Sequence, residues 1–286
     1  MKNALDLSSQ NRKSNAYRGV ATYFALTFAI SWTGALLVAL PHLLRHEHLG
    51  QTVGIVMFPV MLLGPIVAGI VLTFVSSGRR GLQDLWSRMS VNRVPLRWCF
   101  ALLIPPLLVL TVLLVLRTFA SPVFAPNRFF WGILFGIPAG LLEEVGWMGY
   151  AFPRMHSPSH WLRSSVVLGL LWSVWHLPVV DFLGTASPHH SYWLAFFFAF
   201  TLAMTAMRVV IAWIYVHTRS VLLCQLMHIS STGSLVVFSA PKVTAGQEAA
   251  WYAIYGGMLW LLVIVAALGQ SRRLFSSGEN FRRDTA

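Results

Sequence analysis

Two adjacent glutamates, Glu143 and Glu144, lie inside an apolar run that is long enough to cross a membrane. A charged side chain near the bilayer centre costs about 2.5 to 3.5 kcal/mol, so the pair opposes insertion by roughly 5 to 7 kcal/mol. The chain has only nine acidic residues, and two of them at the most costly position indicate a function. A carboxylate in apolar surroundings, crowded by a second one, can take a proton from water near neutral pH. The pair therefore supplies a candidate general base.

The three apolar runs that follow each contain ionisable groups of their own, His176, Arg208 and His228. At about 1.5 Å of rise per residue, Glu143, Arg208 and His228 lie roughly 12 to 14 Å from the same membrane face, with His176 somewhat deeper. Buried charges must pair or contact water, so we expect four consecutive helices to share a polar cavity. There, one imidazole can orient a water molecule, while the other and a hydroxyl can stabilise an oxyanion. The set predicts an amide hydrolase.

Other chemistries use the same residue types. Two histidines and a carboxylate with an open water position form a known catalytic zinc set, so zinc stays an alternative although we predict no cofactor. A His-Glu-x-x-His motif is absent from the sequence. Buried glutamate, histidine and arginine would also suit a transporter of protons or small solutes.

The composition sets the fold class. The chain has 286 residues, of which 56% are hydrophobic and 10% charged, and its mean hydropathy is +0.65. This is too apolar for an ordinary soluble domain and predicts an all-α, polytopic membrane protein. We expect a polar N-terminal tail (1–19), one integral membrane domain (20–270) and a basic tail (271–286). Runs of about 20 apolar residues predict eight spans, at 20–44, 53–75, 98–116, 129–152, 161–183, 191–217, 220–238 and 249–269.

The net charge of +12 follows the membrane and does not indicate nucleic acid binding. When Lys and Arg are counted on alternate sides of the predicted spans, sixteen lie on one side and four on the other. The positive-inside rule then places both termini in the cytoplasm, which agrees with an even number of spans in a multi-pass cell membrane protein. The minority side carries Arg45, Arg117, Arg128 and Lys242.

The cytoplasmic loop 76–97 has apolar residues at helical spacing among arginines. Leu82, Leu85, Trp86 and Met89 form this pattern. It fits an amphipathic helix on the membrane surface and an ordinary connector about equally.

Three short motifs resemble those of the CPBP family, the CAAX prenyl protease and bacteriocin-processing intramembrane proteases, also called the Abi family. The segment Glu143 to Tyr150 is similar to its double-glutamate motif, Trp172 to His176 to its aromatic-histidine motif, and His228 to Thr232 to its third motif. The resemblance covers about residues 130–240. It implies an eight-helix membrane fold and a glutamate-dependent endopeptidase. In it, Glu143 would be the base, His176 would orient the water and His228 would donate to the oxyanion.

Two positions depart from the family pattern. Met148 stands where the family has arginine, one turn after Glu144, and Thr232 stands where it has asparagine. We therefore expect Arg208 to pair with Glu144 across helices, unless Glu144 is protonated. Threonine donates one hydrogen bond with a geometry different from that of an amide, which would weaken oxyanion stabilisation.

The expected substrate is a peptide or a lipid-modified protein within the membrane, among membrane lipids. The alternative function is a membrane binding or immunity protein that keeps the cavity without turnover.

Overall fold

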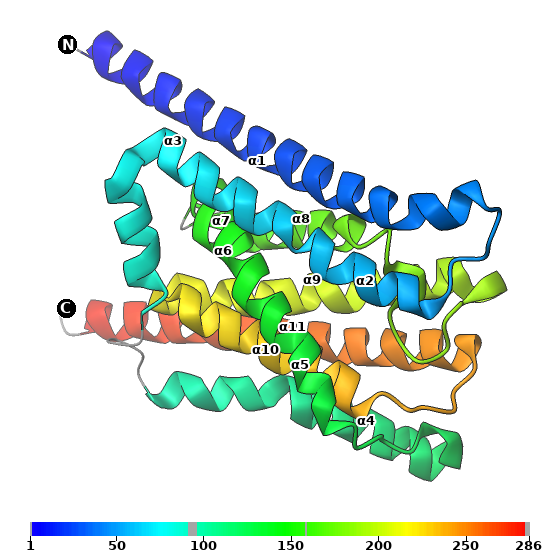
Figure 1. The fold of residues 1–286 in the computed structure, drawn as a ribbon. Helices are drawn as coiled ribbons and strands as arrows, with labels where there is room; N and C mark the ends of the chain where they lie inside the picture. The colour runs from blue at the N-terminus through cyan, green and yellow to red at the C-terminus, as the bar shows by residue number, and fades with distance from the viewer. Residues whose placement is uncertain (1, 91–95, 158, 284–286) are drawn as a thin grey trace.

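The regular elements are all helical in this computed structural model (Figure 1), which describes residues 2–90, 96–157 and 159–283. Side chains are described for 18–90, 97–157 and 159–268. The all-α prediction is confirmed for these residues. The predicted tails, 1–19 and 271–286, fall almost wholly on residues whose side chains lie outside the described set.

Six stretches of the described chain are long and apolar enough to cross a membrane. They account for six of the eight predicted spans, and they make the chain a multi-pass membrane protein. The helices in them are α1 (Lys2–Leu44), α2 (Gln51–Met61), α3 (Leu63–Arg88), α4 (Ile104–Phe119), α9 (Trp193–Thr218), α10 (Val221–Phe238) and α11 (Ala245–Arg283). The start of α1 and the end of α11 lie on the same side of the bundle (Figure 1).

The predicted span 129–152 is not one continuous helix. It consists of α5 (Ile133–Pro138), α6 (Glu144–Gly146) and α7 (Phe152–Met155), joined by π-helical turns at Ala139–Glu143 and Trp147–Ala151. Such wide turns are rare and are frequent at functional sites. They flank the glutamate pair on both sides.

Glycines let neighbouring backbones approach this broken helix closely. A Cβ atom on Gly140 would meet the backbone of Gln225 in α10, and one on Gly146 would meet the carbonyl of Pro65 in α3. Small residues at membrane helix interfaces allow such close approach. The glutamate pair is thereby held between α3 and α10, which also pack on this segment.

The predicted span 161–183 ends earlier than expected. Helix α8 (Trp161–Trp175) stops just before His176, and the chain turns through a 3₁₀ segment at Val180–Phe182. Proline lacks the amide hydrogen that helix continuation requires and disfavours helical geometry in the residue before it, and Pro178 lies at this point. The turn places His176 at a helix end within the protein.

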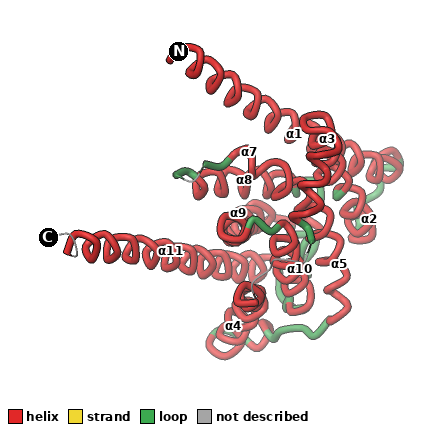
Figure 2. Tube along the Cα trace, turned by 90° about the vertical axis from the view of Figure 1, so that its left-hand side faces the viewer, coloured by secondary structure: helices red, strands yellow, loops and turns green. Residues whose placement is uncertain are grey.

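Helix α9 lies between α8 and α11 (Figure 2) and is the most buried of the six candidate spans. Glycines again permit the contact: Gly169 of α8 lies against Thr205, and Gly256 of α11 lies against Ala203. With both its faces covered, α9 can present a charge to the interior.

Helix α3 bends sharply at Gly78, whose φ is +59°. The residues after the bend run across the end of the bundle (Figure 1), with Leu85 buried and Trp86 73% exposed. The helix interpretation of the 76–97 loop is therefore confirmed as far as Arg88.

Candidate active site

Glu143 ends the first π-helical turn and is fully buried. Its Oε2 atom accepts hydrogen bonds from the indole N–H of Trp147 (3.1 Å) and from that of Trp172 (2.7 Å). Its Oε1 atom has no hydrogen-bond partner among the residues that the structure describes. One oxygen is thus fixed by two neutral donors, and the other is available for chemistry.

Glu144 has a different environment, because its partners include a cation. The Nη1 atom of Arg208 lies 2.8 Å from both of its carboxylate oxygens, and His228 Nδ1 lies 2.7 Å from Oε1. The predicted pairing of Arg208 with Glu144 is confirmed. Met148, where the family motif has arginine, is buried, so the cation comes from α9 instead.

The guanidinium of Arg208 is also stacked on an aromatic ring. Its Cζ atom lies 4.1 Å from the ring centroid of Trp172. Within the described part of the chain, its Nε and Nη2 atoms have no hydrogen-bond partner, so the cation–π contact is their main compensation. Trp172 therefore connects the two glutamates: its N–H holds Glu143, and its face supports the cation that neutralises Glu144.

His176 is oriented by the end of its own helix. Its Nδ1 atom lies 2.8 Å from the carbonyl oxygen of Trp172, which can only accept, so Nδ1 carries the proton. In the neutral ring, Nε2 is then the acceptor. The imidazole also packs edge-on against Trp175, with ring centroids 4.7 Å apart.

A cavity of about 140 Å³ brings these groups together. Five of the seven predicted site residues line it, while Glu144 and Arg208 lie behind its wall. The hydroxyl of Thr232 makes no hydrogen bond within the described residues and is free to act in the cavity. The five are Glu143, Trp172, His176, His228 and Thr232.

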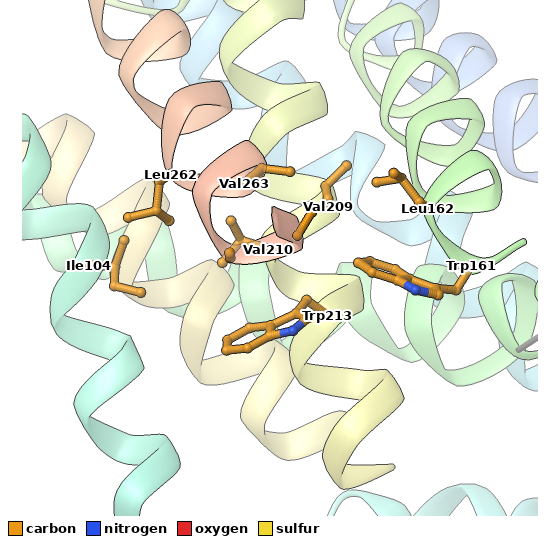
Figure 3. A pocket seen from close by; sticks show the side chains of 10 residues that line it. Ile104, Trp161, Leu162, Val209, Val210, Trp213, Leu262 and Val263 are labelled. Atoms are coloured by element: carbon orange, nitrogen blue, oxygen red, sulfur yellow. The ribbon is translucent and has the colours of Figure 1, made fainter. Parts of the chain in front are cut away.

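A second cavity, of about 220 Å³, lies among α4, α8, α9 and α11 (Figure 3). Its lining contains Trp161, Trp213 and aliphatic side chains, and no titratable group. It can take an apolar chain but offers no acid, base or nucleophile.

No three His, Cys, Asp or Glu side chains in the described residues are arranged to hold a metal ion.

Comparison with known proteins finds a family match over part of the chain. Residues 125–233 match the family model described as "Type II CAAX prenyl endopeptidase Rce1-like". The chain carries an Rce1-like CAAX protease family domain. The glutamate pair, both histidines, Arg208 and Thr232 all lie inside this domain.

A curated relative agrees with the family match. Over 93 residues the chain is 29% identical to "CAAX prenyl protease 2" of Methanococcus maripaludis. The aligned residues make up 32% of this chain and 34% of that protein. The chain thus matches about a third of the length of this relative. The likeness is to a member of a peptidase family.

The sequence pattern did not predict two residues, one in the candidate site and one outside the matched residues 125–233. It gave Trp147 no role, although its position four residues after Glu143 places both on one helix face. It also missed Glu248, which is fully buried. An acidic residue immediately before the apolar run 249–269, in a chain with nine acids, was the available signal.

Proposed function

We propose that this protein is an intramembrane endopeptidase in which Glu143 activates water to cleave a peptide bond. The observation that carries the proposal is the unpartnered Oε1 of Glu143 at a cavity that it shares with two imidazoles. A buried carboxylate with a free oxygen is a general base, because it accepts a proton wherever water reaches it.

Each group in the cavity has a place in the reaction. Glu143 Oε1 takes a proton from water, while His176 Nε2 accepts the other water hydrogen and orients the oxygen. The resulting hydroxide attacks the carbonyl carbon and forms a tetrahedral oxyanion. When the C–N bond breaks, protonated Glu143 returns its proton to the leaving amine. The products are a carboxylic acid and an amine, and the base is regenerated.

His228 supplies a hydrogen bond to the oxyanion. Its Nδ1 proton is held by Glu144, so Nε2 carries a proton only in the imidazolium state. Glu143, Glu144 and Arg208 together carry one net negative charge when ionised, and an imidazolium brings the buried cluster to zero. In the proposed mechanism His228 donates as the imidazolium, and the Thr232 hydroxyl is a second donor in the same cavity.

The proposed substrate is a peptide, or a lipid-modified protein of the CAAX type, that reaches the cavity from the membrane. The name of the archaeal relative supports a prenylated substrate. Apolar cavity walls, including Phe200, Met204 and Leu235, suit a segment that arrives with lipid around it.

Glu143→Gln tests the proposal. The purified protein in detergent is given an internally quenched peptide that ends in a farnesylated Cys-aliphatic-aliphatic-X sequence. We expect the wild type to cleave it and the variant to lose about 10²- to 10⁴-fold in turnover, because glutamine cannot take the proton. Glu47→Gln, at an exposed position in the loop after α1, is the matched control and should retain full activity.

Three outcomes would change the assignment. Near-normal turnover by Glu143→Gln would remove its role as the base. Loss of activity with a chelator, restored by zinc, would favour the metalloprotease alternative. Wild-type protein that binds but does not cleave prenylated or unmodified peptides would favour the binding or immunity protein, which the Thr232 departure also suggests.

A further inference from the structure

The loop between α8 and α9 forms part of the wall of the catalytic cavity. Leu183, Gly184 and Thr185 line the same cavity as Glu143. Figure 1 places this loop at the end of the bundle away from the start of α1 and the end of α11. We call residues 183–189 the wall loop. Loops are usually mobile because little buries their backbone, so a loop that forms part of a cavity must be held in place.

A buried carboxylate from α11 holds the wall loop. Glu248 is fully buried, and its two oxygens accept separate backbone hydrogen bonds. Oε1 accepts from the amide of Thr185 (2.9 Å), and Oε2 accepts from the amide of Ala186 (2.8 Å). The Thr185 hydroxyl adds a longer contact to Oε1 at 3.3 Å. Hydrogen bonds to a charged acceptor are about twice as strong as neutral ones, so two of them define the loop backbone well.

The far end of the wall loop is fixed by a buried histidine. His189 Nδ1 lies 3.1 Å from Asp181 Oδ1, and its Nε2 lies 3.4 Å from Glu248 Oε2. The imidazole stacks on Phe196 of α9, with ring centroids 3.7 Å apart. The histidine therefore lies between two carboxylates and connects the loop to both α9 and α11.

The loop conformation itself is matched to the carboxylate. Gly184 has a φ of +96°, a conformation that favours glycine. A Cβ atom at this position would meet the carboxylate of Glu248. Thr185 adds a second anchor, because its hydroxyl donates to the carbonyl of Ala240 at 2.8 Å. Gly184 and Thr185 of the wall loop both line the cavity, and both pack directly against the Glu248 carboxylate.

We propose that Glu248 is a positioning residue for substrate binding: it holds the wall loop as the surface against which the substrate peptide lies. The inference rests on the proposed endopeptidase function and extends it to α11, outside the matched residues 125–233. Among the described residues, the hydrogen bonds to the Glu143 and Glu144 side chains come from Trp147, Trp172, Arg208 and His228, and none comes from the wall loop. Loosening the loop should therefore weaken substrate binding and leave the chemical step largely intact.

The experiment compares Glu248→Ala and Glu248→Gln with the wild type in two measurements on the full chain. Hydrogen exchange of residues 183–189 reports the anchoring, and cleavage of the quenched farnesylated peptide reports KM and kcat separately. Alanine removes both acceptors, whereas glutamine keeps one. We expect exchange to rise at least tenfold for alanine and less for glutamine. KM should rise in the same order, by at least tenfold for alanine, with kcat within about threefold of wild type.

Gln247→Ala is the matched control, because Gln247 is adjacent to Glu248 and its side chain accepts a hydrogen bond from the Thr244 amide at the start of α11, not from the wall loop. It should leave exchange, KM and kcat unchanged. Unchanged exchange in both Glu248 variants, or a loss confined to kcat, would overturn the positioning role. If Glu248→Ala does not fold, the exchange rate and KM of Glu248→Gln, compared with the wild type, decide whether Glu248 has the positioning role. If the wild type cleaves nothing, the proposed function fails with the positioning role, while the exchange data still decide whether Glu248 anchors the loop.

Discussion

The two adjacent glutamates have different surroundings, and this difference supports the different roles proposed for them. Glu143 receives two neutral indole donors and keeps one oxygen free. Glu144 is neutralised by Arg208 and bound by His228. Two carboxylates whose environments differ in this way are suited to different tasks. In the proposed mechanism Glu143 accepts the proton, while Glu144 binds His228.

A double-mutant cycle tests the cross-helix pair. We expect Arg208→Met and Glu144→Gln each to lower the free energy of unfolding by about 3 to 5 kcal/mol, because each leaves an unpaired buried charge. The double variant should cost clearly less than the sum, with a coupling on the order of 0.5 to 3 kcal/mol. Urea or thermal unfolding in detergent measures the free energy of unfolding of the wild type, the two single variants and the double variant. Additive effects would mean that the 2.8 Å contacts contribute no net interaction.

The two tryptophans that donate to Glu143 should not be equivalent. Trp172→Phe removes the shorter hydrogen bond and weakens the stacking on Arg208. Trp147→Phe removes only the longer one. A hydrogen bond to a charged group contributes about 1.5 to 3 kcal/mol, so we expect kcat/KM to fall about 10- to 150-fold for Trp172→Phe. Peptide cleavage measures both variants, and an equal or larger loss for Trp147→Phe would contradict this ranking.

At the scale of the elements, the broken helix α5 to α7 places the glutamates. A regular helix would put the acids on its face at fixed intervals, whereas the π-helical turns before and after them alter this spacing. Close packing stabilises the irregular geometry, since Gly146 lies directly against α3.

Gly146→Ala tests this packing. The added methyl group would meet the Pro65 carbonyl and the Tyr23 hydroxyl, so we expect a loss of about 1 to 3 kcal/mol in unfolding free energy from overpacking. Gly257→Ala on α11 is the control, because no atom lies within 4 Å of its would-be Cβ. That change should be neutral or slightly stabilising, since alanine favours helix. Thermal unfolding measures the stability of both variants and of the wild type. If Gly146→Ala were as stable as Gly257→Ala, α3 could move away from the added methyl group without cost.

At the scale of the whole molecule, the charge asymmetry and the path of the chain predict one orientation. The start of α1 and the end of α11 lie on one side (Figure 1), and the charge rule makes that side cytoplasmic. The wall loop and Glu248 would then lie toward the outer face of the membrane.

Reporter fusions in a bacterial host measure the orientation. Green fluorescent protein at the C-terminus should fluoresce, because it folds in the cytoplasm. Alkaline phosphatase inserted after Lys242, in the exposed loop between α10 and α11, should be active, because it needs an oxidising compartment. The reverse pattern would overturn the orientation, and with it the placement of the wall loop.

The sequence by itself determined the class of the protein and most of the residues that meet in the candidate site. Long apolar runs require helices in lipid, because every backbone polar group must be paired within its own segment. Costly charges in those runs, Glu143, Glu144 and Arg208, identified the polar centre, and the absence of another cation predicted the pairing of Arg208 with Glu144. These inferences rest on local sequence patterns and on the number of charged residues in the apolar runs, so they need no tertiary structure.

Only the tertiary structure decided how the groups act. The break of the fourth span depends on the packing of α3 and α10, which hydropathy does not encode. Trp172 lies on α8, so its hydrogen bond to Glu143 and its stacking on Arg208 depend on how separate helices face one another. Glu248 is the clearest case. Its partners lie about 60 residues away in the chain, and long-range contacts of that kind follow from the assembled fold, because no local pattern specifies them.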